Sequence, residues 1–180
     1  MGEIRKFSAT ELKSSRVLLR GLTEMDVVEI YNACNDYEIQ KWIPLQSPYE
    51  LNHAHNFVKE YAVGQLEGGK GIVFAIEVDQ KFVGVIDIFN TNWTSRICEI
   101  GYWIVLNFRA NGYATEAVDL LASWVIEQQG FQRVEILIAT DNFASQKVVE
   151  RAKFQKEGVC RNKMLNRNRN IDVIMYSRIP

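Results

Sequence analysis

The segment from residue 97 to residue 139 constrains the fold of this chain more than any other. It is predicted to form a strand at 97–105, a helix at 112–129 and a second strand at 134–139. The second strand is apolar almost throughout, which is typical of a central strand covered on both faces. The helix is amphipathic, with apolar residues three or four positions apart: Ala117, Leu120, Leu121, Trp124 and Val125. Strand, helix and strand in this order indicate a βαβ unit with two parallel strands.

The rest of the chain alternates between short strands and helices without repeating that unit. Strands are predicted at 16–20, 72–78, 82–90, 154–160 and 170–178, and helices at 23–34, from 48 onward and at 144–153. Residues 36–48 are expected to be irregular, and residues 1–14 to form a loose leader before a single domain at 15–180. The order of elements predicts one mixed α/β domain rather than a doubly wound sheet.

Charge and cysteine content exclude several classes of protein. The 180 residues include 21 Lys and Arg against 22 Asp and Glu, which excludes a uniformly basic nucleic-acid binder. Cys34, Cys98 and Cys160 are scattered, so they give neither a disulfide framework nor metal-ligand spacing, and we expect buried thiols and no bound metal. The N-terminus is polar and no apolar run approaches 18 residues. These features predict a cytoplasmic protein with no membrane or nucleic-acid partner.

An anion site is predicted where the strand at 97–105 leads into the helix at 112–129. Gly112 has no Cβ and Ala114 has only a methyl side chain, so an anion can approach the first-turn N–H groups closely. The helix dipole favours negative charge there, and Arg109 adds a cation beside the loop. Physical reasoning alone supports a pyrophosphate site about as well as an ordinary glycine-containing turn.

Several segments resemble the GNAT acetyltransferase superfamily. Arg109-x-x-Gly112-x-Ala114 resembles its acyl-CoA signature, Q/R-x-x-G-x-G/A, and Asn142-x-x-Ser145 resembles its N-x-x-S segment. Residues 98–103 resemble the E-I-G-Y-W strand of the Rim-type branch, which acetylates protein N-termini. The first and last strands also resemble that branch, so the similarity covers residues 14–178. It implies the GNAT fold, with a mixed, mostly antiparallel, seven-stranded twisted sheet flanked by about four helices.

The resemblance implies an N-acetyltransferase that moves an acetyl group from acetyl-CoA directly to a primary amine. The favoured acceptor is the α-amino group of a protein or peptide. The alternatives are a small amine such as an aminoglycoside or polyamine, another acyl donor such as succinyl-CoA, and a CoA-binding sensor without catalysis. Rim-type enzymes often dimerise, so a homodimer is a further expectation.

The residues expected to bind acetyl-CoA follow from the same resemblance. They are Ile104, Val105, Arg109, Ala110, Asn111, Gly112, Tyr113, Ala114, Thr115, Asn142 and Ser145. Tyr113 and Thr115 are expected to contribute main-chain donors. Asn142 is expected either to contact the pantetheine arm or to cap a helix. The donor for the carbonyl oxyanion is expected to be a backbone N–H near Ile104 or Val105.

Acetyl transfer needs a neutral amine, a stabilised oxyanion and a proton for the departing thiolate. Glu99 is the candidate base, and strand alternation places it on one face with Gly101 and Trp103. A base that acts through water is sufficient for an α-amino group, whose pKa is about 7.7–8.0. Ser145 is the candidate acid or CoA-contacting hydroxyl. Trp42 and Tyr49 lie in the segment that lines the acceptor pocket in similar proteins, although both also fit as core aromatics.

The chain departs from the superfamily pattern after the helix at 144–153. Lys153 stands where a glycine is usual, so we expect this helix to end without the left-handed cap that glycine provides. Many GNAT enzymes place a tyrosine soon after this position as general acid. Here Phe154 follows and the next tyrosine is Tyr176, so the identity of the acid stays open.

The charges are unevenly distributed along the chain. Residues 24–50 contain six acids and one base, whereas residues 151–169 contain seven bases and one acid. In a GNAT fold the acidic stretch is expected near the acceptor entrance, where it would attract a cationic amine. The basic stretch is expected to meet an acidic partner surface or the CoA phosphates.

Overall fold

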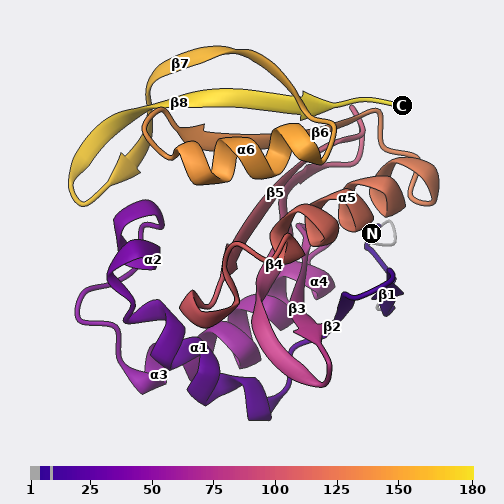
Figure 1. Ribbon diagram of the computed structural model, residues 1–180. Helices are drawn as coiled ribbons and strands as arrows, with labels where there is room; N and C mark the ends of the chain where they lie inside the picture. The colour runs from indigo at the N-terminus through magenta and orange to yellow at the C-terminus, as the bar shows by residue number, and fades with distance from the viewer. Residues whose placement is uncertain (1–4, 9) are drawn as a thin grey trace.

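A single twisted sheet of eight strands forms the centre of the molecule in this computed structural model, which describes residues 5–8 and 10–180 (Figure 1). The strands lie in the order β1-β2-β3-β4-β5-β6-β8-β7. Every neighbouring pair is antiparallel except β5 and β6, which are parallel. The strands are β1 (Leu12–Lys13), β2 (Leu18–Gly21), β3 (Ile72–Val78), β4 (Lys81–Asn92), β5 (Ile97–Ile104), β6 (Arg133–Ala139), β7 (Gln155–Asn166) and β8 (Arg169–Arg178).

Helices cover both faces of this sheet (Figure 1). On one face lie α1 (Val27–Cys34), α2 (Tyr37–Trp42), α3 (Leu51–Asn56) and α4 (Ala62–Glu67), with a π-helical turn at Phe57–Tyr61 between α3 and α4. On the other face lie α5 (Tyr113–Glu127) and α6 (Phe143–Arg151). Short 3-10 turns precede α1, at Glu24–Asp26, and α5, at Leu106–Phe108.

Strand alternation divides the core into two clusters. Phe74, Ile86 and Ile100 belong to the larger cluster, which also holds the apolar faces of α5 and β6. Val73 and Val85 point the other way and belong to a second cluster with residues of α1 and α3. Because successive side chains of a strand point to opposite faces, the apolar runs in β3 and β4 supply both clusters at once.

The mixed α/β fold predicted from the sequence is confirmed, with differences in detail. The sheet has eight strands rather than seven, because Leu12–Lys13 pairs with β2. Residues 36–48 are not wholly irregular, since they include α2, which begins after Asp36. The Asp36 carboxylate accepts a hydrogen bond from the Ile39 N–H and caps this helix.

The prediction of a loose leader at 1–14 is wrong for the residues that the structure describes; residues 1–4 and 9 lie outside them. Phe7 is only 1% exposed and packs against Trp93 and Phe131. Ser14 donates a hydrogen bond to Glu116 in the first turn of α5. The leader is thus attached by an aromatic side chain, a short strand pair and a carboxylate, which hydropathy periodicity does not reveal.

The end of α6 differs from the expectation for a helix without a terminal glycine. Lys153 adopts the left-handed conformation, with φ 66°. The N–H of Phe154 donates to the carbonyl of Val149, and the N–H of Lys153 donates to that of Glu150. These two bonds form a Schellman motif. Lysine therefore takes the position that glycine would occupy with less strain.

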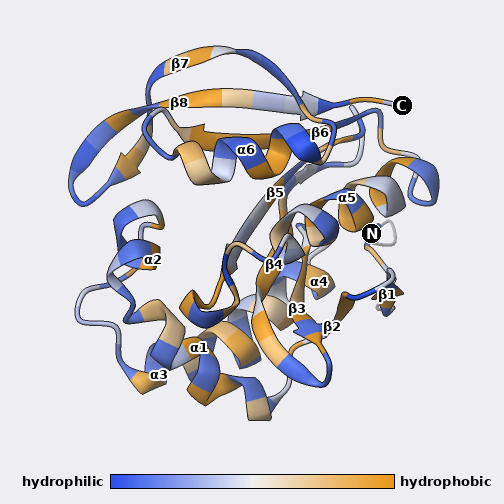
Figure 2. Cartoon of the chain, viewed as in Figure 1, coloured by the Kyte–Doolittle hydropathy of each residue, from blue (hydrophilic) through white to orange (hydrophobic). Residues whose placement is uncertain are grey.

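Two further sequence features can be compared with the structure. Cys34 and Cys98 are buried thiols as expected, whereas Cys160 is only partly buried. Within residues 5–8 and 10–180, no helix has the length and apolar character needed to span a membrane. Figure 2 shows the tip of the β7–β8 hairpin as strongly hydrophilic, in agreement with the basic stretch in the sequence.

The parallel pair at the centre of the sheet separates after a short contact. Ile97, Cys98 and Glu99 of β5 pair with residues 133–135 of β6. Beyond Glu99 the two strands have no further paired positions, so a gap opens between the end of β5 and the end of β6. This gap interrupts the central sheet and leaves strand backbone groups without a neighbouring strand.

Candidate active site

Two cavities meet at the gap between β5 and β6. The helix-side cavity, of about 430 Å³, lies between the end of β5 and the N-terminal ends of α5 and α6. The sheet-side cavity, of about 480 Å³, lies on the other side, among β4, β5, α2 and the π-helical turn. The cavities share the residues that line the gap: Trp42, Ile43, Tyr102, Trp103, Asn142 and Ser145. A molecule in one cavity can therefore meet a molecule in the other beside Ser145.

The N-terminus of α5 is open toward the helix-side cavity. Gly112 precedes the helix with φ 83°, and no side chain caps this end. The first-turn N–H groups at 113–115 therefore have no intrahelical acceptor, and together with the helix dipole they favour an anion. Lys147 and Arg151 of α6 also line this cavity and add positive charge.

Most of the residues predicted to bind CoA line the helix-side cavity: Ile104, Arg109, Ala110, Gly112, Tyr113, Ala114, Thr115, Asn142 and Ser145. Two others, Val105 and Asn111, are not among its lining residues. The Val105 N–H donates to the carbonyl of Val83. The Asn111 amide donates to carbonyls of its own loop. Their predicted contact with CoA is therefore not supported by their positions.

The backbone N–H of Ile104 is better placed than that of Val105 to stabilise an oxyanion. In an antiparallel pair, successive residues of a strand direct their N–H and C=O groups to opposite sides. Since Val105 bonds to β4, Ile104 directs its backbone groups toward the gap. The Arg109 guanidinium accordingly reaches the carbonyl of Ile104 at 2.9 Å from that side.

Arg109 forms an ion pair within the protein in this structure and is not an unpaired cation. Its Nη2 lies 2.8 Å from the carboxylate of Asp36, the residue that caps α2. The Arg109 guanidinium in turn lowers the pKa of Asp36 against the effect of burial. The ion pair ties the loop before α5 to α2, whose Trp42 lines both cavities. The sequence suggested Arg109 as an anion ligand but gave no sign of this partner.

Other acids of the 24–50 stretch are also paired. Asp26 is buried against Arg20, and Glu24 lies beside Lys59. The acidic stretch therefore presents fewer unpaired charges than its composition suggests.

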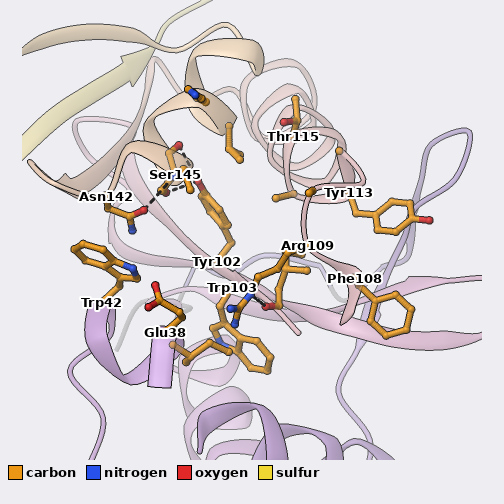
Figure 3. Close-up of a pocket in the computed structure, with 18 of the residues that line it drawn as sticks. Glu38, Trp42, Tyr102, Trp103, Phe108, Arg109, Tyr113, Thr115, Asn142 and Ser145 are labelled. Atoms are coloured by element: carbon orange, nitrogen blue, oxygen red, sulfur yellow. Dashed lines mark hydrogen bonds between the residues drawn. The ribbon is translucent and has the colours of Figure 1, made fainter. Parts of the chain in front are cut away.

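Two side chains of the N-x-x-S segment meet at the start of α6 (Figure 3). The Asn142 side chain accepts a hydrogen bond from the Ser145 N–H at 3.1 Å, so it caps the helix while lining both cavities. The Ser145 hydroxyl lies 2.6 Å from the hydroxyl of Tyr102 on β5, and either can be the donor. Burial raises the pKa of Tyr102, so its hydroxyl keeps its proton near neutral pH.

Tyr113 shows the opposite arrangement. Figure 3 shows its ring directed away from Ser145 and the other labelled residues around the gap. The Arg16 guanidinium lies over this ring, 5.2 Å from its centre. Tyr113 thus lines the helix-side cavity with its ring directed away from the gap, and its main-chain contribution to CoA binding stays a prediction.

Glu99 lines the sheet-side cavity. The Asn90 amide donates a hydrogen bond to its carboxylate at 3.0 Å. Burial raises the pKa of Glu99, and the charge of Glu135 on β6 adds to this effect, whereas Asn90 and Lys163 oppose it. A partly buried carboxylate with a raised pKa is a stronger base than an exposed one.

A second carboxylate, Asp87 of β4, lies in the same cavity. It pairs directly with Gly101 of β5. A Cβ placed on Gly101 would lie 2.8 Å from the Asp87 carboxylate, so the glycine makes room for this acid. Burial and the charge of Glu99 raise the pKa of Asp87 to about 7. The sequence placed Glu99 on one face with Gly101 but gave no sign that Asp87 lies opposite this glycine.

Aromatic side chains form much of the remaining wall of the sheet-side cavity. They include both residues that the sequence placed in the acceptor segment and several from β4, β5 and the π-helical turn: Trp42, Tyr49, Phe57, Tyr61, Phe89 and Trp103. Tyr49 is buried, with 7% of its surface exposed, so it belongs to the core and to the cavity wall together. In the described part of the chain, no three His, Cys, Asp or Glu side chains are grouped as metal ligands.

Two residues of this site were not predicted from the sequence. Tyr102 was recognised only as part of a resembling strand, and its contact with Ser145 spans 43 positions. Asp87 becomes part of the site only through the register between β4 and β5. Alternation within the strand at 82–90 was the one available signal, because it places a charged residue between apolar neighbours of a buried strand.

The chain is similar to several known proteins. The model of the acetyltransferase (GNAT) domain family matches residues 16–155. The uncharacterized N-acetyltransferase YoaA of Bacillus subtilis (strain 168) is 28% identical over 168 residues, which cover 92% of this chain and 94% of that protein.

Two solved structures share the fold. The ribosomal L7/L12 alpha-N-protein acetyltransferase RimL, in complex with coenzyme A, has a TM-score of 0.86 at 21% identity, covering 94% of this chain and 98% of its own. The microcin C7 self immunity acetyltransferase MccE, in complex with acetyl-CoA and AMP, has a TM-score of 0.84 at 20% identity, covering 93% and 94%.

Proposed function

Because the chain belongs to the GNAT acetyltransferase family and is an acetyltransferase, we propose that it transfers the acetyl group of acetyl-CoA to the α-amino group of a protein or peptide. The observation that carries this proposal is the meeting of two cavities of opposite character at Ser145. One has the positive end of a helix and exposed cations, and the other has two carboxylates. A polyanionic donor and a cationic acceptor would each be drawn to one side.

The helix-side cavity suits acetyl-CoA. The uncapped N-terminus of α5 offers backbone donors for the pyrophosphate, and Gly112 keeps the approach free of a side chain. Lys147 and Arg151 can pair with phosphate groups at the cavity edge. The gap between β5 and β6 offers Ile104 as the backbone partner for the carbonyl oxygen. CoA-bound RimL has the same fold, which supports this use of the cavity.

The catalytic groups would act from the two sides of the gap. A carboxylate of the sheet-side cavity, Glu99 or its neighbour Asp87, would accept the proton that the acceptor ammonium must lose, directly or through water. Ser145 would donate a proton to the departing thiolate, and Tyr102, whose hydroxyl touches it, would position or replenish that proton. The lack of a tyrosine soon after α6 is then compensated by Tyr102 on β5.

The direct test uses peptides with a free or a blocked N-terminus. Peptides that begin with Ser, Ala or Met and contain one internal Lys are incubated with acetyl-CoA, and thiol release is followed. Free N-termini are expected to support turnover, with the acetyl group located on the α-nitrogen by mass spectrometry. The matched peptides with formylated N-termini are expected to be inactive. Acetylation of the internal Lys alone, or no turnover with any peptide, would contradict the proposal.

One observation favours a second candidate, a small-molecule amine. The tip of the β7–β8 hairpin packs over α2, where the Asn166 amide donates to the carbonyl of Lys41 at 2.8 Å. Arg167 also lies over the ring of Tyr37. Met164 of the same hairpin lines the sheet-side cavity, so the hairpin narrows the space beside the acceptor and favours an acceptor of limited size. The structure of MccE in complex with acetyl-CoA and AMP, which has the same fold, supports a small-molecule acceptor. Aminoglycosides and polyamines in the same assay separate the two candidates.

The quaternary structure and the cellular location are not needed for this proposal. A homodimer and a cytoplasmic location stay predictions from the sequence.

A further inference from the structure

The strand register brings Asp87 to the acceptor side of the gap. Asp87 is the direct partner of Gly101, and Phe89 is the direct partner of Glu99. Directly opposed residues of an antiparallel pair share a face, and so do residues two apart on one strand. Asp87 and Glu99 are therefore diagonal neighbours on one face, and both line the sheet-side cavity.

Gly101 is the reason that the Asp87 carboxylate fits at this position. A Cβ at residue 101 would lie 2.8 Å from Oδ1 of Asp87 and 3.1 Å from the ring of Phe89. The carboxylate thus occupies the space in which a larger residue 101 would place its side chain. Gly101 is followed on β5 by Tyr102 and Trp103, which line both cavities. Asp87 is therefore close to the place where the two cavities meet.

The neighbours of Asp87 leave its charge without a cation. Glu99 faces it from β5, and the Tyr61 hydroxyl lies next to it from the π-helical turn. Glu135 of β6 and Lys163 of β7 act on Glu99 from the other side. Within residues 5–8 and 10–180, neither Asp87 nor Glu99 forms an ion pair with a Lys, Arg or His.

Other carboxylates of the molecule show the opposite arrangement. Asp26, Asp36, Glu116 and Glu157 each accept hydrogen bonds from an arginine, and the pKa of each is lowered. For Asp87 and Glu99 the pKa is raised instead. Two carboxylates that form no ion pair within the described residues, in a cavity with an aromatic wall, form a site that an ammonium group would complete.

We propose that Asp87 is a catalytic residue that works with Glu99: the two carboxylates bind the acceptor's ammonium group, and Asp87 accepts the proton that the nitrogen must lose. The inference rests on the proposed function, because it assigns the acceptor to the sheet-side cavity. The N–H bond breaks and the O–H bond of the carboxyl group forms. The freed nitrogen pair attacks the thioester carbonyl, the carbon–sulfur bond breaks, and the thiolate takes a proton from Ser145. The second proton that the nitrogen loses on becoming an amide returns to Ser145 through Tyr102 or water, so the serine hydroxyl is restored. Asp87 then releases its proton to solvent.

This proposal also defines the acceptor as a primary ammonium on an apolar body. The two carboxylates favour a cationic group, and the aromatic wall of the cavity favours an apolar group attached to that cation. The pair shares its titration, so apparent pKa values belong to both carboxyls together. Burial raises the pKa of Asp87 toward that of an α-ammonium group, about 7.7–8.0, which reduces the free-energy difference for proton transfer between the two groups.

The test compares Asp87→Asn with Asp79→Asn across pH 5.5–9.0, with the peptide Ala-Phe-Ala-Ala amide as acceptor. Asp79 is an exposed residue of the β3–β4 turn, with a left-handed backbone that Asn tolerates, so it is a matched control. For wild type, kcat/KM is expected to rise with pH through an acid limb near neutrality. Asp87→Asn is expected to lose about 10²-fold in kcat/KM at pH 8.

The pH at which kcat/KM falls on the acid side distinguishes a catalytic role of Asp87 from a structural one. Without the charge of Asp87, Glu99 ionises more readily, so the remaining limb of Asp87→Asn is expected at lower pH than in wild type. A merely structural residue would reduce the amplitude and leave the limb in place. Full activity of Asp87→Asn, or an unmoved limb, would overturn the inference. Asp79→Asn is expected to match wild type throughout.

Binding and stability give readouts that do not depend on turnover. In calorimetric titrations of CoA-saturated protein at pH 8, the same peptide is expected to bind Asp87→Asn about tenfold more weakly than wild type. Equal binding, or no binding to wild type, would overturn the inference. An enzyme that binds the peptide in an Asp87-dependent way and never acetylates it would overturn the proposed function alone.

The stability of Asp87→Asn follows from the sign of the pKa shift. The pKa of Asp87 is higher in the folded protein than its usual 3.8, so its ionisation opposes folding increasingly from pH 3.8 to about 7. At pH 8, Asp87→Asn is therefore expected to unfold at a temperature no lower than wild type. A less active but equally stable variant is the signature of a functional acid; a lower unfolding temperature would contradict this reading.

Discussion

The two cavities on either side of the β5–β6 gap differ chiefly in how their charges are held. Beside the helix-side cavity, Asp36 and Glu116 are paired with arginines, and hydrogen bonds from Ser14 and Arg16 lower the pKa of Glu116 to about 2. In the sheet-side cavity, Asp87 and Glu99 lack such partners, and the pKa of each is raised. The difference shows how one small domain can hold a polyanion and a cation at adjacent sites. The carboxylates that pair with arginines stabilise the fold, whereas Asp87 and Glu99, which lack such partners, can bind a ligand.

The gap itself carries little charge. Ser145 and Tyr102 meet there as neutral hydroxyls, and Trp42 and Trp103 close its sides. A neutral acetyl group is the part of the donor that suits such a surrounding. The charges of the two cavities would thus determine which substrate binds on each side, and the reaction would take place at the gap between them.

Ser145→Ala is expected to reduce activity most, because it removes the hydroxyl at the place where the two cavities meet. Without the hydroxyl, the thiolate must take its proton from water, so kcat is expected to fall about 10²-fold. The KM for acetyl-CoA should change little, because the N–H groups of α5 are unaffected. Steady-state kinetics on both substrates measure this split.

Tyr102→Phe serves as the comparison for Ser145→Ala. It removes the hydroxyl partner and keeps the serine, so we expect a smaller loss of kcat. If Ser145→Ala kept full kcat while Tyr102→Phe lost it, Tyr102 would be the acid and the role assigned to Ser145 would be wrong.

A smaller and more specific effect is expected from Gly112→Ala at the mouth of the helix-side cavity. A left-handed backbone costs an alanine about 1 kcal/mol relative to glycine. If the proposed function is right, the added methyl group would also hinder the approach of the pyrophosphate to the N-terminus of α5. The KM for acetyl-CoA is expected to rise about tenfold, and peptide binding should be unchanged.

Gly130→Ala is the matched control for Gly112→Ala. Gly130 follows the other end of α5 with φ 70° and has open space around it. Denaturant titration should show a similar loss of stability, about 1 kcal/mol, in both variants. Only Gly112→Ala should lose affinity for acetyl-CoA; equal KM values would contradict the anion site.

Features that are formed by residues close together in the chain were predictable from the sequence. The turn at Gly112 and the amphipathic helix after it depend on residues close in the chain, and so does the Asn142 cap. Periodicity and small side chains therefore revealed the helix-side cavity. The resemblance to known motifs supplied Glu99 and Ser145.

The parts that escaped prediction depend on contacts between distant segments. Arg109 meets Asp36 across 73 positions, and Tyr102 meets Ser145 across 43. Asp87 joins the site through a strand register that a one-residue shift would reverse. The attachment of Phe7 likewise depends on a pocket made by Trp93 and Phe131. A single sequence carries no periodic signal for such pairs.

The central claim is that the two cavities are the two halves of one reaction site. Binding of a conjugate in which the α-nitrogen of Ala-Phe-Ala-Ala amide is joined to the CoA sulfur through an acetyl bridge tests it most directly. Calorimetry should show the conjugate binding at least about 10²-fold more tightly than CoA, because both halves bind at once. Asp87→Asn should reduce this advantage. Binding no tighter than that of CoA alone would contradict the claim.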